Sequence, residues 1–325
     1  MMQHEMPRQA HVPVFLDRVI QLLTPALRHE SAVCVDATLG AGGHTEALLT
    51  SLPHLTVVGI DRDRYALELA QRRLEPFGSR FIPAHAVYDE IGEVLADLDI
   101  TAVSGVLFDL GVSSMQLDIA ERGFAYAQDG PLDMRMDQSR DFTAYDVVNT
   151  YAQKDLERIL KRYGEERFAN RIARRILSDR EKAPISTSRQ LADLVKESVP
   201  AATRRTGGNP AKRTFQALRI EVNRELDVLE RALPAARNVM APHGRIVVLS
   251  YHSLEDRIVK RDFAESSTSS SPPGLPMDLP GTEPTTRLVT KGAQPPDAEE
   301  IEENPRAASA KLRAIEKLPD HNRHS

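Results

Sequence analysis

The residues in this chain that are most capable of chemistry are two acids and a group of glycines near the start of the sequence. Asp36 ends a short apolar run, and Gly40, Gly42 and Gly43 follow within seven residues. Glycine allows a sharp turn and a close approach to a ligand because it has no Cβ. Asp61 ends the next apolar run, 19 residues after Gly42, where a carboxylate can accept two hydrogen bonds from a ribose diol. The pattern indicates a pocket for a ligand that carries a nucleoside.

The spacing of the glycines narrows the choice of nucleoside ligand. The chain has G-x-G-G, not the G-x-G-x-x-G of dinucleotide-binding folds. The carboxylate of Asp36 lies close to the turn, where it would repel a pyrophosphate and attract an α-amino group. We therefore favour S-adenosylmethionine over NAD. The alternative, that the turn only joins a strand to a helix, stays open at this point.

The elements that must position these residues follow from the apolar pattern. Four short apolar runs predict strands at 33–37, 57–61, 81–84 and 103–110, with helices between them, after an amphipathic helix at 11–23. This alternation predicts a Rossmann-like, mostly parallel sheet with helices on both faces. Ligands bind such sheets beyond the carboxyl ends of the strands. We expect Asp36, Asp61, the loop 84–88 and Asp109 to converge there.

The alternation of strands and helices stops in the middle of the chain and resumes later. Helices without strands are expected at 143–149, 153–163, 167–179 and 188–198. A long helix at 215–233, a buried strand at 244–250 and a terminal antiparallel pair at 287–290 and 311–318 follow. The sequence thus predicts one sheet domain, formed by 1–122 and 215–325, with a small all-helical domain inserted at 123–214. A flexible loop is expected near 265–286, which is rich in Ser and Pro.

Composition sets the class of protein. With 325 residues and 41% hydrophobic content, the chain can fill a sizeable core. The single cysteine, Cys34, cannot form an internal disulfide or a thiolate metal site. No apolar run approaches the ~20 residues that span a bilayer, and no His, Asp and Glu spacing resembles a metal-ligand set. We expect a cytoplasmic protein without a metal and without a membrane anchor.

Positive charge is concentrated in the predicted insert. The net charge of the chain is −5, yet residues 151–215 contain 16 Lys or Arg and 8 Asp or Glu. Four cations flank a glycine turn that could follow an irregular RNA backbone: Arg204, Arg205, Lys212 and Arg213. An ordinary solvated face is the alternative, above all for the arginines of 167–180, which have acids between them.

Seven segments, in order along the chain, resemble one family. They are Asp36-Ala-Thr-Leu-Gly-Ala-Gly-Gly-His44, Asp109-Leu-Gly-Val-Ser-Ser114, Ala120-Glu-Arg-Gly-Phe124, Asp129-Gly-Pro-Leu-Asp-Met-Arg-Met136, Tyr163-Gly-Glu-Glu-Arg167, Arg213-Thr-Phe-Gln-Ala-Leu-Arg-Ile220 and His252-Ser-Leu-Glu-Asp-Arg257. The chain resembles the ribosomal RNA small subunit methyltransferase H family, also called MraW.

The resemblance implies a fold, a reaction and a set of binding residues. It implies a class I methyltransferase that transfers a methyl group from S-adenosylmethionine to the exocyclic 4-amino group of one cytidine in the decoding centre of 16S rRNA, within the small ribosomal subunit. It also implies an inserted helical domain. The cofactor residues that it implies are Gly42, Gly43, His44, Asp61, Tyr88, Asp109 and Gln116.

The residues themselves favour an amino-group acceptor over a ring carbon. Methylation of cytosine C5 needs a cysteine nucleophile, and Cys34 lies in a strand interior where it would be inert. An exocyclic amine needs acceptors that hold its hydrogens and orient it. Asp109 could be such a catalytic acceptor, a cofactor contact or only a loop cap. His44 could contact the cofactor or cap a helix.

A second class of function fits the same pattern. In a metabolite-sensing RNA-binding or ribosome-assembly protein without turnover, the glycine pocket would only sense its ligand. A methyltransferase that acts on DNA or protein is a nearer alternative. The number of subunits in the active form does not follow from the sequence.

Overall fold

The computed structural model describes residues 13–200, 209–272, 279 and 281–319, which form two compact units. The sheet unit comprises 1–111 and 229–325, and the helical unit comprises 112–228. The predicted limits of the insert, 123 and 214, both lie inside the helical unit. Each unit is described by itself below.

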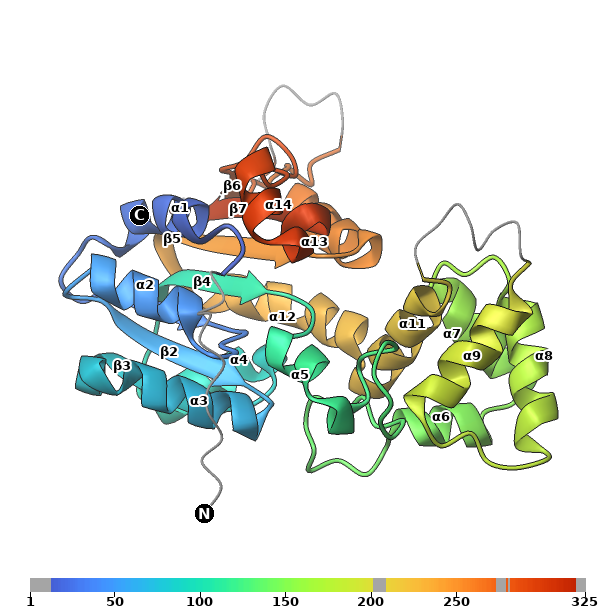
Figure 1. Cartoon of the computed structure of the whole chain (residues 1–325). Helices are drawn as coiled ribbons and strands as arrows, with labels where there is room; N and C mark the ends of the chain where they lie inside the picture. The colour runs from blue at the N-terminus through green and yellow to red at the C-terminus, as the bar shows by residue number, and fades with distance from the viewer. Residues whose placement is uncertain (1–12, 201–208, 273–278, 280, 320–325) are drawn as a thin grey trace, which may run out of the picture. The chain divides into compact units, whose positions relative to one another are not determined.

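A seven-stranded sheet forms the centre of the sheet unit, in the order β3-β2-β1-β4-β5-β7-β6 within the described residues (Figure 1). Its strands are β1 Val33–Asp36, β2 Thr56–Asp61, β3 Phe81–His85, β4 Val103–Asp109, β5 Met240–Ser250, β6 Thr286–Leu288 and β7 Lys311–Lys317. Strands β1 to β5 are parallel, whereas β7 runs antiparallel to both β5 and β6. The predicted Rossmann-like, mostly parallel sheet and its terminal antiparallel pair are confirmed.

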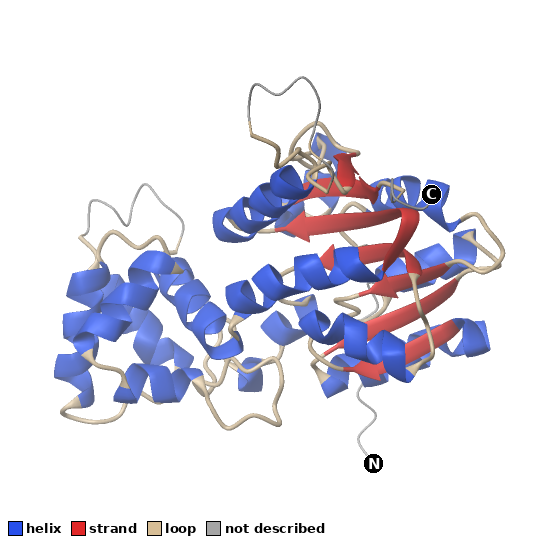
Figure 2. Ribbon diagram, turned by 180° about the vertical axis from the view of Figure 1, so that it is seen from behind, coloured by secondary structure: helices blue, strands red, loops and turns tan. Residues whose placement is uncertain are grey.

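Helices cover both faces of this sheet, as Figures 1 and 2 show: α1, α2 and α3 lie on one face, and α4 and α12 on the other. The helices are α1 Leu16–Leu27, α2 Gly43–Ser51, α3 Arg64–Leu74, α4 Ile91–Asp97, α12 Glu225–Val239, α13 Ser253–Ser266 and α14 Ala298–Glu303. Short 3-10 turns span Glu75–Arg80, Tyr88–Glu90 and Pro305–Ser309. Side chains alternate across each strand, so Cys34 and Val57 join the core under α1 to α3. The first residues of α12 belong to the helical unit.

The strand register places three acids at one edge of the sheet. Asp36 pairs with Gly59 of β2 and with Leu107 of β4. Asp61 and Asp109 are the last residues of β2 and β4. Because parallel strands end at the same edge, their carboxylates lie beyond the carboxyl ends of the sheet, as a ligand site in such a fold requires.

The helical unit packs short helices around an apolar centre. They are α5 Ser114–Asp118, η3 Ala120–Arg122, α6 Ala144–Thr150, α7 Gln153–Arg162, α8 Ala169–Arg180, α9 Ser188–Ser198 and α11 Ala211–Asn223. Helices α6 and α9 begin at capping boxes, Thr143 with Asp146 and Thr187 with Gln190. The four helices predicted between 143 and 198 are confirmed.

The single long helix predicted for 215–233 is wrong. The chain forms α11 and α12 instead, separated by Arg224, whose φ of 51° is left-handed. The side-chain amide of Asn223, the last residue of α11, donates to the carbonyl of Met134 (2.7 Å) and accepts from the backbone N–H of Met136 (2.8 Å). A contact with a distant loop therefore fixes the end of α11, although the apolar pattern continues past it.

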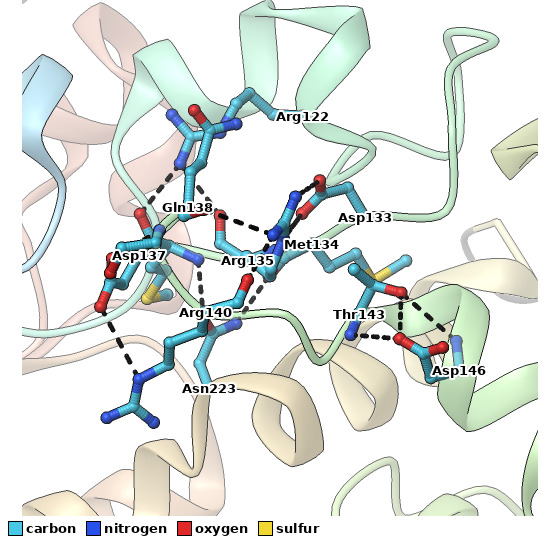
Figure 3. Close-up of polar contacts among 12 residues, drawn as sticks. Arg122, Asp133, Met134, Arg135, Asp137, Gln138, Arg140, Thr143, Asp146 and Asn223 are labelled. Carbon is cyan, nitrogen blue, oxygen red and sulfur yellow. Dashed lines mark hydrogen bonds and ion pairs between the residues drawn. The ribbon is translucent and has the colours of Figure 1, made fainter.

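That loop, residues 129–143, is held by a polar network (Figure 3). The guanidinium of Arg135 donates to both carboxylate oxygens of Asp133, at 2.9 and 2.7 Å. The guanidinium of Arg122 donates to the carbonyls of Arg135 and Met136. Because Arg122 and Arg135 satisfy carbonyl and carboxylate oxygens of the loop, the Asp133–Arg135 salt bridge stabilises its conformation.

Two remaining sequence expectations concern loops and membranes. The loop expected near 265–286 includes 273–278 and 280, which lie outside the described residues. Residues 265 and 266 are the last two of α13, residue 286 is the first of β6, and 267–272, 279 and 281–285 between them form neither helix nor strand. Among the described helices, none combines the length and the apolar character needed to cross a bilayer.

Candidate functional site

The glycine turn between β1 and α2 is shaped by backbone conformation and by packing. Gly40 and Gly42 have φ values of 52° and 78°, which L side chains rarely adopt. A Cβ on Gly42 would lie 2.9 Å from Leu74 Cδ1, and a Cβ on Gly43 would lie 2.6 Å from Pro13 Cγ. Glycine is therefore favoured at 42 by the positive φ and at 43 by packing against Pro13, whatever ligand the turn holds.

Asp61 ties the glycine turn to the second strand. Its Oδ2 accepts a hydrogen bond from the backbone N–H of Gly40 (2.8 Å), and its Oδ1 accepts from that of Asp63 (2.8 Å). Burial raises the pKa of this carboxyl, and the two backbone donors oppose the shift. A carboxylate has about four lone-pair positions, and these two bonds use one on each oxygen. The carboxylate can thus hold the turn and still accept hydrogen bonds from a ligand diol.

Asp36 is a buried carboxyl beneath the same turn. Its Oδ2 accepts from the Thr45 hydroxyl (2.7 Å), and its Oδ1 accepts from the backbone N–H of Thr38 (3.4 Å). Burial raises its pKa to about 6, although nearby His44 lowers it. Around neutral pH the group is negative and favours a cation in its neighbourhood.

His44 lies in the first turn of α2 and is buried, with its two ring nitrogens in different surroundings. Its Nε2 is 3.0 Å from the carbonyl oxygen of Val14, which can only accept, so Nε2 carries the hydrogen. Burial lowers the pKa of His44, so the ring is neutral near pH 7 and Nδ1 presents a lone pair. This Nδ1 lies 3.6 Å from Oδ2 of Asp109. His44 contacts a site acid, so it is not merely a helix cap.

Asp109, at the end of β4, has a side chain that is 25% exposed and can therefore be reached from solvent. Its backbone N–H donates to the Thr38 hydroxyl (2.6 Å), and its Oδ1 accepts from the hydroxyl of Tyr251 (2.7 Å). Burial raises the pKa of Asp109 to about 7, against the hydrogen bond from Tyr251, which lowers it. Its protonation state is balanced at neutral pH, as in groups that act on protons.

Tyr88 forms an aromatic wall after β3. It is buried, and its ring meets Phe108 edge to face, with centroids 5.7 Å apart. The guanidinium of Arg62 lies 5.6 Å from the Tyr88 centroid, within the range of a cation–π contact. Arg62 directly follows Asp61, so the ring and the acid belong to neighbouring strand ends.

The other predicted site residues belong to the helical unit or lie outside the described residues. Gln116 is buried in α5, where its side chain completes a capping box with Ser113. Lys212 and Arg213 lie exposed in the first turn of α11, and Arg213 Nη1 donates to the carbonyl of Glu165 (3.0 Å). Arg204 and Arg205 lie outside the described residues.

His252 and Cys34, which the sequence analysis also named, have structural roles. His252 is the N-cap of α13 and accepts from the backbone N–H of Glu255 through Nδ1 (3.4 Å). Cys34 is buried in β1, and burial raises its thiol pKa far above the usual range, so it is inert as predicted.

Within the sheet unit, one set of residues lies at the carboxyl ends of the strands: Asp36, Asp61, Asp109, His44, Tyr88 and Tyr251. Tyr251 and Thr38 are the contributors that the sequence did not single out. Tyr251 follows β5 directly. The sequence could have indicated it as a site residue, because residues that follow a strand lie at the carboxyl edge of the sheet. Hydrogen-bond acceptors of Asp109 and His44 face one another, which suits a ligand that carries N–H donors and positive charge.

Comparisons with known proteins agree with this geometry. The family model described as the MraW methylase family matches residues 8–318. Proteins named ribosomal RNA small subunit methyltransferase H are similar to this chain along most of their length. The one from Thermobifida fusca is 60% identical over 311 residues, which cover 96% of this chain and 94% of that protein.

Two further relatives carry the same name. The protein from a Nocardioides species is 61% identical over 308 residues and covers 95% of this chain and 97% of its own length. The protein from Kocuria rhizophila is 56% identical over 317 residues, with 98% and 97% covered. With one family model and close relatives that match nearly end to end, this chain belongs to the MraW methylase family.

Proposed function

We propose that this protein transfers a methyl group from S-adenosylmethionine to the exocyclic 4-amino group of a cytidine in the decoding centre of 16S rRNA. The observation that carries the proposal is the family match along nearly the whole chain. The relatives are named as small subunit rRNA methyltransferases. The exact nucleotide follows from the family resemblance.

The residues at the sheet edge fit this methyl donor. A cationic ligand is favoured by the buried carboxylate of Asp36 and by the partly exposed carboxylate of Asp109. Asp61 keeps acceptor capacity for a ribose diol, and the Tyr88 ring offers an aromatic face. The proposed cofactor residues, which follow from the family resemblance, are Gly42, Gly43, His44, Asp61, Tyr88, Asp109 and Gln116.

The reaction needs positioning more than it needs a nucleophile on the protein. When bound, the cofactor supplies an electrophilic methyl group on a positively charged sulfur. The acceptor nitrogen forms the new N–C bond as the C–S bond breaks, the electron pair leaves with the sulfur, and one amine hydrogen is released as a proton. We propose Asp109 as the catalytic acceptor that orients the amine and can take up this proton.

The inertness of Cys34 supports an amine as the acceptor. A cytosine C5 methyltransferase needs an accessible thiolate, and the only cysteine of this chain is buried in β1 with its thiol kept protonated. The exocyclic amine needs no covalent attack by the protein. The described acceptors at the strand ends fit such a route.

We also propose that residues 123–214 form the RNA-recognition domain and that Arg204, Arg205, Lys212 and Arg213 bind phosphates. The net positive charge of 151–215 supports this role. Lys212 and Arg213 are exposed, so phosphates can reach them. The substrate would be rRNA within the small ribosomal subunit, and the enzyme would act in the cytoplasm.

The deciding experiment supplies labelled S-adenosylmethionine to small ribosomal subunits that lack the modification. Digestion to nucleosides should place the label in 4-methylcytidine. Label in another nucleoside would change the proposed acceptor. Cofactor binding without labelling of subunits at any assembly stage would favour the alternative, a sensing protein without turnover, and DNA and protein substrates test the nearer alternatives.

A further inference from the structure

Tyr251 joins the end of β5 to the acid at the end of β4. The chain reaches Tyr251 directly after Ser250, the last residue of β5, and the Tyr251 hydroxyl donates to Oδ1 of Asp109 at 2.7 Å. The phenol ring also lies along Gly111, because a Cβ built on Gly111 would be 3.5 Å from Tyr251 Cδ2. The ends of β4 and β5 together therefore fix the position of the Tyr251 hydroxyl.

The start of α13 holds the backbone of Tyr251. Oε2 of Glu255 accepts from the backbone N–H groups of Tyr251 (2.8 Å) and His252 (3.2 Å), while His252 caps the helix in return. Glu255 is buried, with only 3% of its surface exposed, so these bonds are protected from competition by water. The segment 252–257, which the sequence singled out without a role, thus anchors Tyr251.

As a result, the two carboxylate oxygens of Asp109 have different neighbours. Oδ1 of Asp109 receives the Tyr251 hydroxyl, and Oδ2 lies 3.6 Å from Nδ1 of His44. We propose that Tyr251 is a positioning residue for methyl transfer: its hydroxyl holds Asp109 so that Oδ2 stays available to the reacting amine or to the charged end of the cofactor. This inference rests on the proposed function of Asp109.

The charged and titratable groups around Asp109 determine how its pKa responds when the Tyr251 hydroxyl is removed. They are His44 from α2, Asp36 from β1, Tyr251 after β5, Glu255 from α13 and, acting on Tyr251 and His44, Glu300 from α14. Burial and the Asp109 carboxylate raise the pKa of Tyr251 well above its usual value, so the hydroxyl remains a donor. Its hydrogen bond lowers the pKa of Asp109, so its loss raises that pKa.

Tyr251→Phe removes the hydroxyl and keeps the ring. We expect the acidic limb of the kcat profile against pH to move upward by about one pH unit, the size of one lost hydrogen bond to a carboxylate. KM for the rRNA substrate should change less than kcat. Tyr65→Phe is the matched control, because Tyr65 lies exposed on α3; its profile should coincide with that of the parent.

Asp109→Asn separates the inference from the proposed function on which it rests. If this variant keeps full turnover and cofactor affinity, Asp109 has no role and both proposals fall. If it loses turnover while the Tyr251→Phe profile coincides with the parent profile, only the role of Tyr251 is overturned. Unchanged thermal unfolding of Tyr251→Phe would show that a shifted profile does not come from a damaged fold.

Discussion

Nδ1 of His44 and Oδ2 of Asp109 lie 3.6 Å apart, and above pH 7, where Asp109 is ionised, both are hydrogen-bond acceptors. The tautomer follows from the carbonyl of Val14, which accepts a hydrogen bond from the single ring N–H, on Nε2. Two acceptors that face one another gain nothing from each other, and a group with several N–H donors can satisfy both. The pair is thus built for an amine or an ammonium group.

Replacement of the charged acceptor should weaken binding of the cofactor. We expect Asp109→Asn to lower the affinity for S-adenosylmethionine by roughly 1.5 to 3 kcal/mol, the range for hydrogen bonds to charged groups. Isothermal titration calorimetry measures this directly. An affinity equal to that of the parent at pH 8 would remove Asp109 from the cofactor site.

The parent protein should bind the cofactor with release of protons. A cationic ligand favours the ionised form of Asp109, whose pKa in the free protein is raised to about 7, so affinity should fall as the pH drops below 7. Calorimetry near pH 7 in two buffers with different ionisation heats counts the protons. Asp109→Asn is the control, and equal proton release by both proteins would contradict the assignment to Asp109.

The same carboxyl should destabilise the unliganded protein at high pH. Its pKa is raised from 3.8 to about 7 on folding. A raised carboxyl pKa favours the folded state fully below pH 3.8, and this contribution is lost as the pH rises through 7. We expect Asp109→Asn to raise the free energy of unfolding by roughly 1 to 3 kcal/mol at pH 8 and by much less at pH 5. Urea titrations at both values test this, and an equal gain at both would show another cause.

Strands β1, β2 and β4 were predictable because each is a short, mostly buried apolar run that ends in an aspartate. The predicted strand at 57–61 differs from β2 by one residue, and the acid at its end lies where expected. The break between α11 and α12 was not predictable, because apolar periodicity continues through Arg224. It depends on the bonds between Asn223 and a loop almost 90 residues earlier in the chain.

The site was predictable where residues share a motif and was missed where they meet only through packing. Asp36, Asp61 and Asp109 end neighbouring strands, and the register alone brings them together. Tyr251 belongs to no acidic or glycine motif, and it reaches Asp109 across 142 residues of sequence. The collision between a Cβ at 43 and Pro13 likewise requires a contact that spacing does not reveal.

Asp61 should contribute to cofactor affinity in addition to holding the glycine turn. We expect Asp61→Ala to weaken cofactor binding by roughly 1 to 3 kcal/mol through lost charge-assisted hydrogen bonds. Asp63→Ala is a matched control, because Asp63 caps α3 by accepting from the backbone N–H of Tyr65 (3.1 Å). The control should cost about 1 kcal/mol of stability and leave affinity nearly unchanged. Equal losses of affinity in both variants would mean that a disturbed loop is the cause.

The basic segment should bind RNA through phosphates, with a measurable dependence on salt. Each phosphate contact contributes about 0.7 to 0.9 to the slope of log K against log salt concentration, so Arg204→Gln with Arg205→Gln should flatten the slope by about one to two. The control is Arg171→Gln with Arg175→Gln on exposed positions of α8, where Arg175 already pairs with Asp179 and Glu197. Titration of a fragment of small subunit rRNA by fluorescence anisotropy at several salt concentrations gives both slopes. If the two double variants flatten the slope equally, net charge explains the effect, and Arg204 and Arg205 are not specific phosphate contacts.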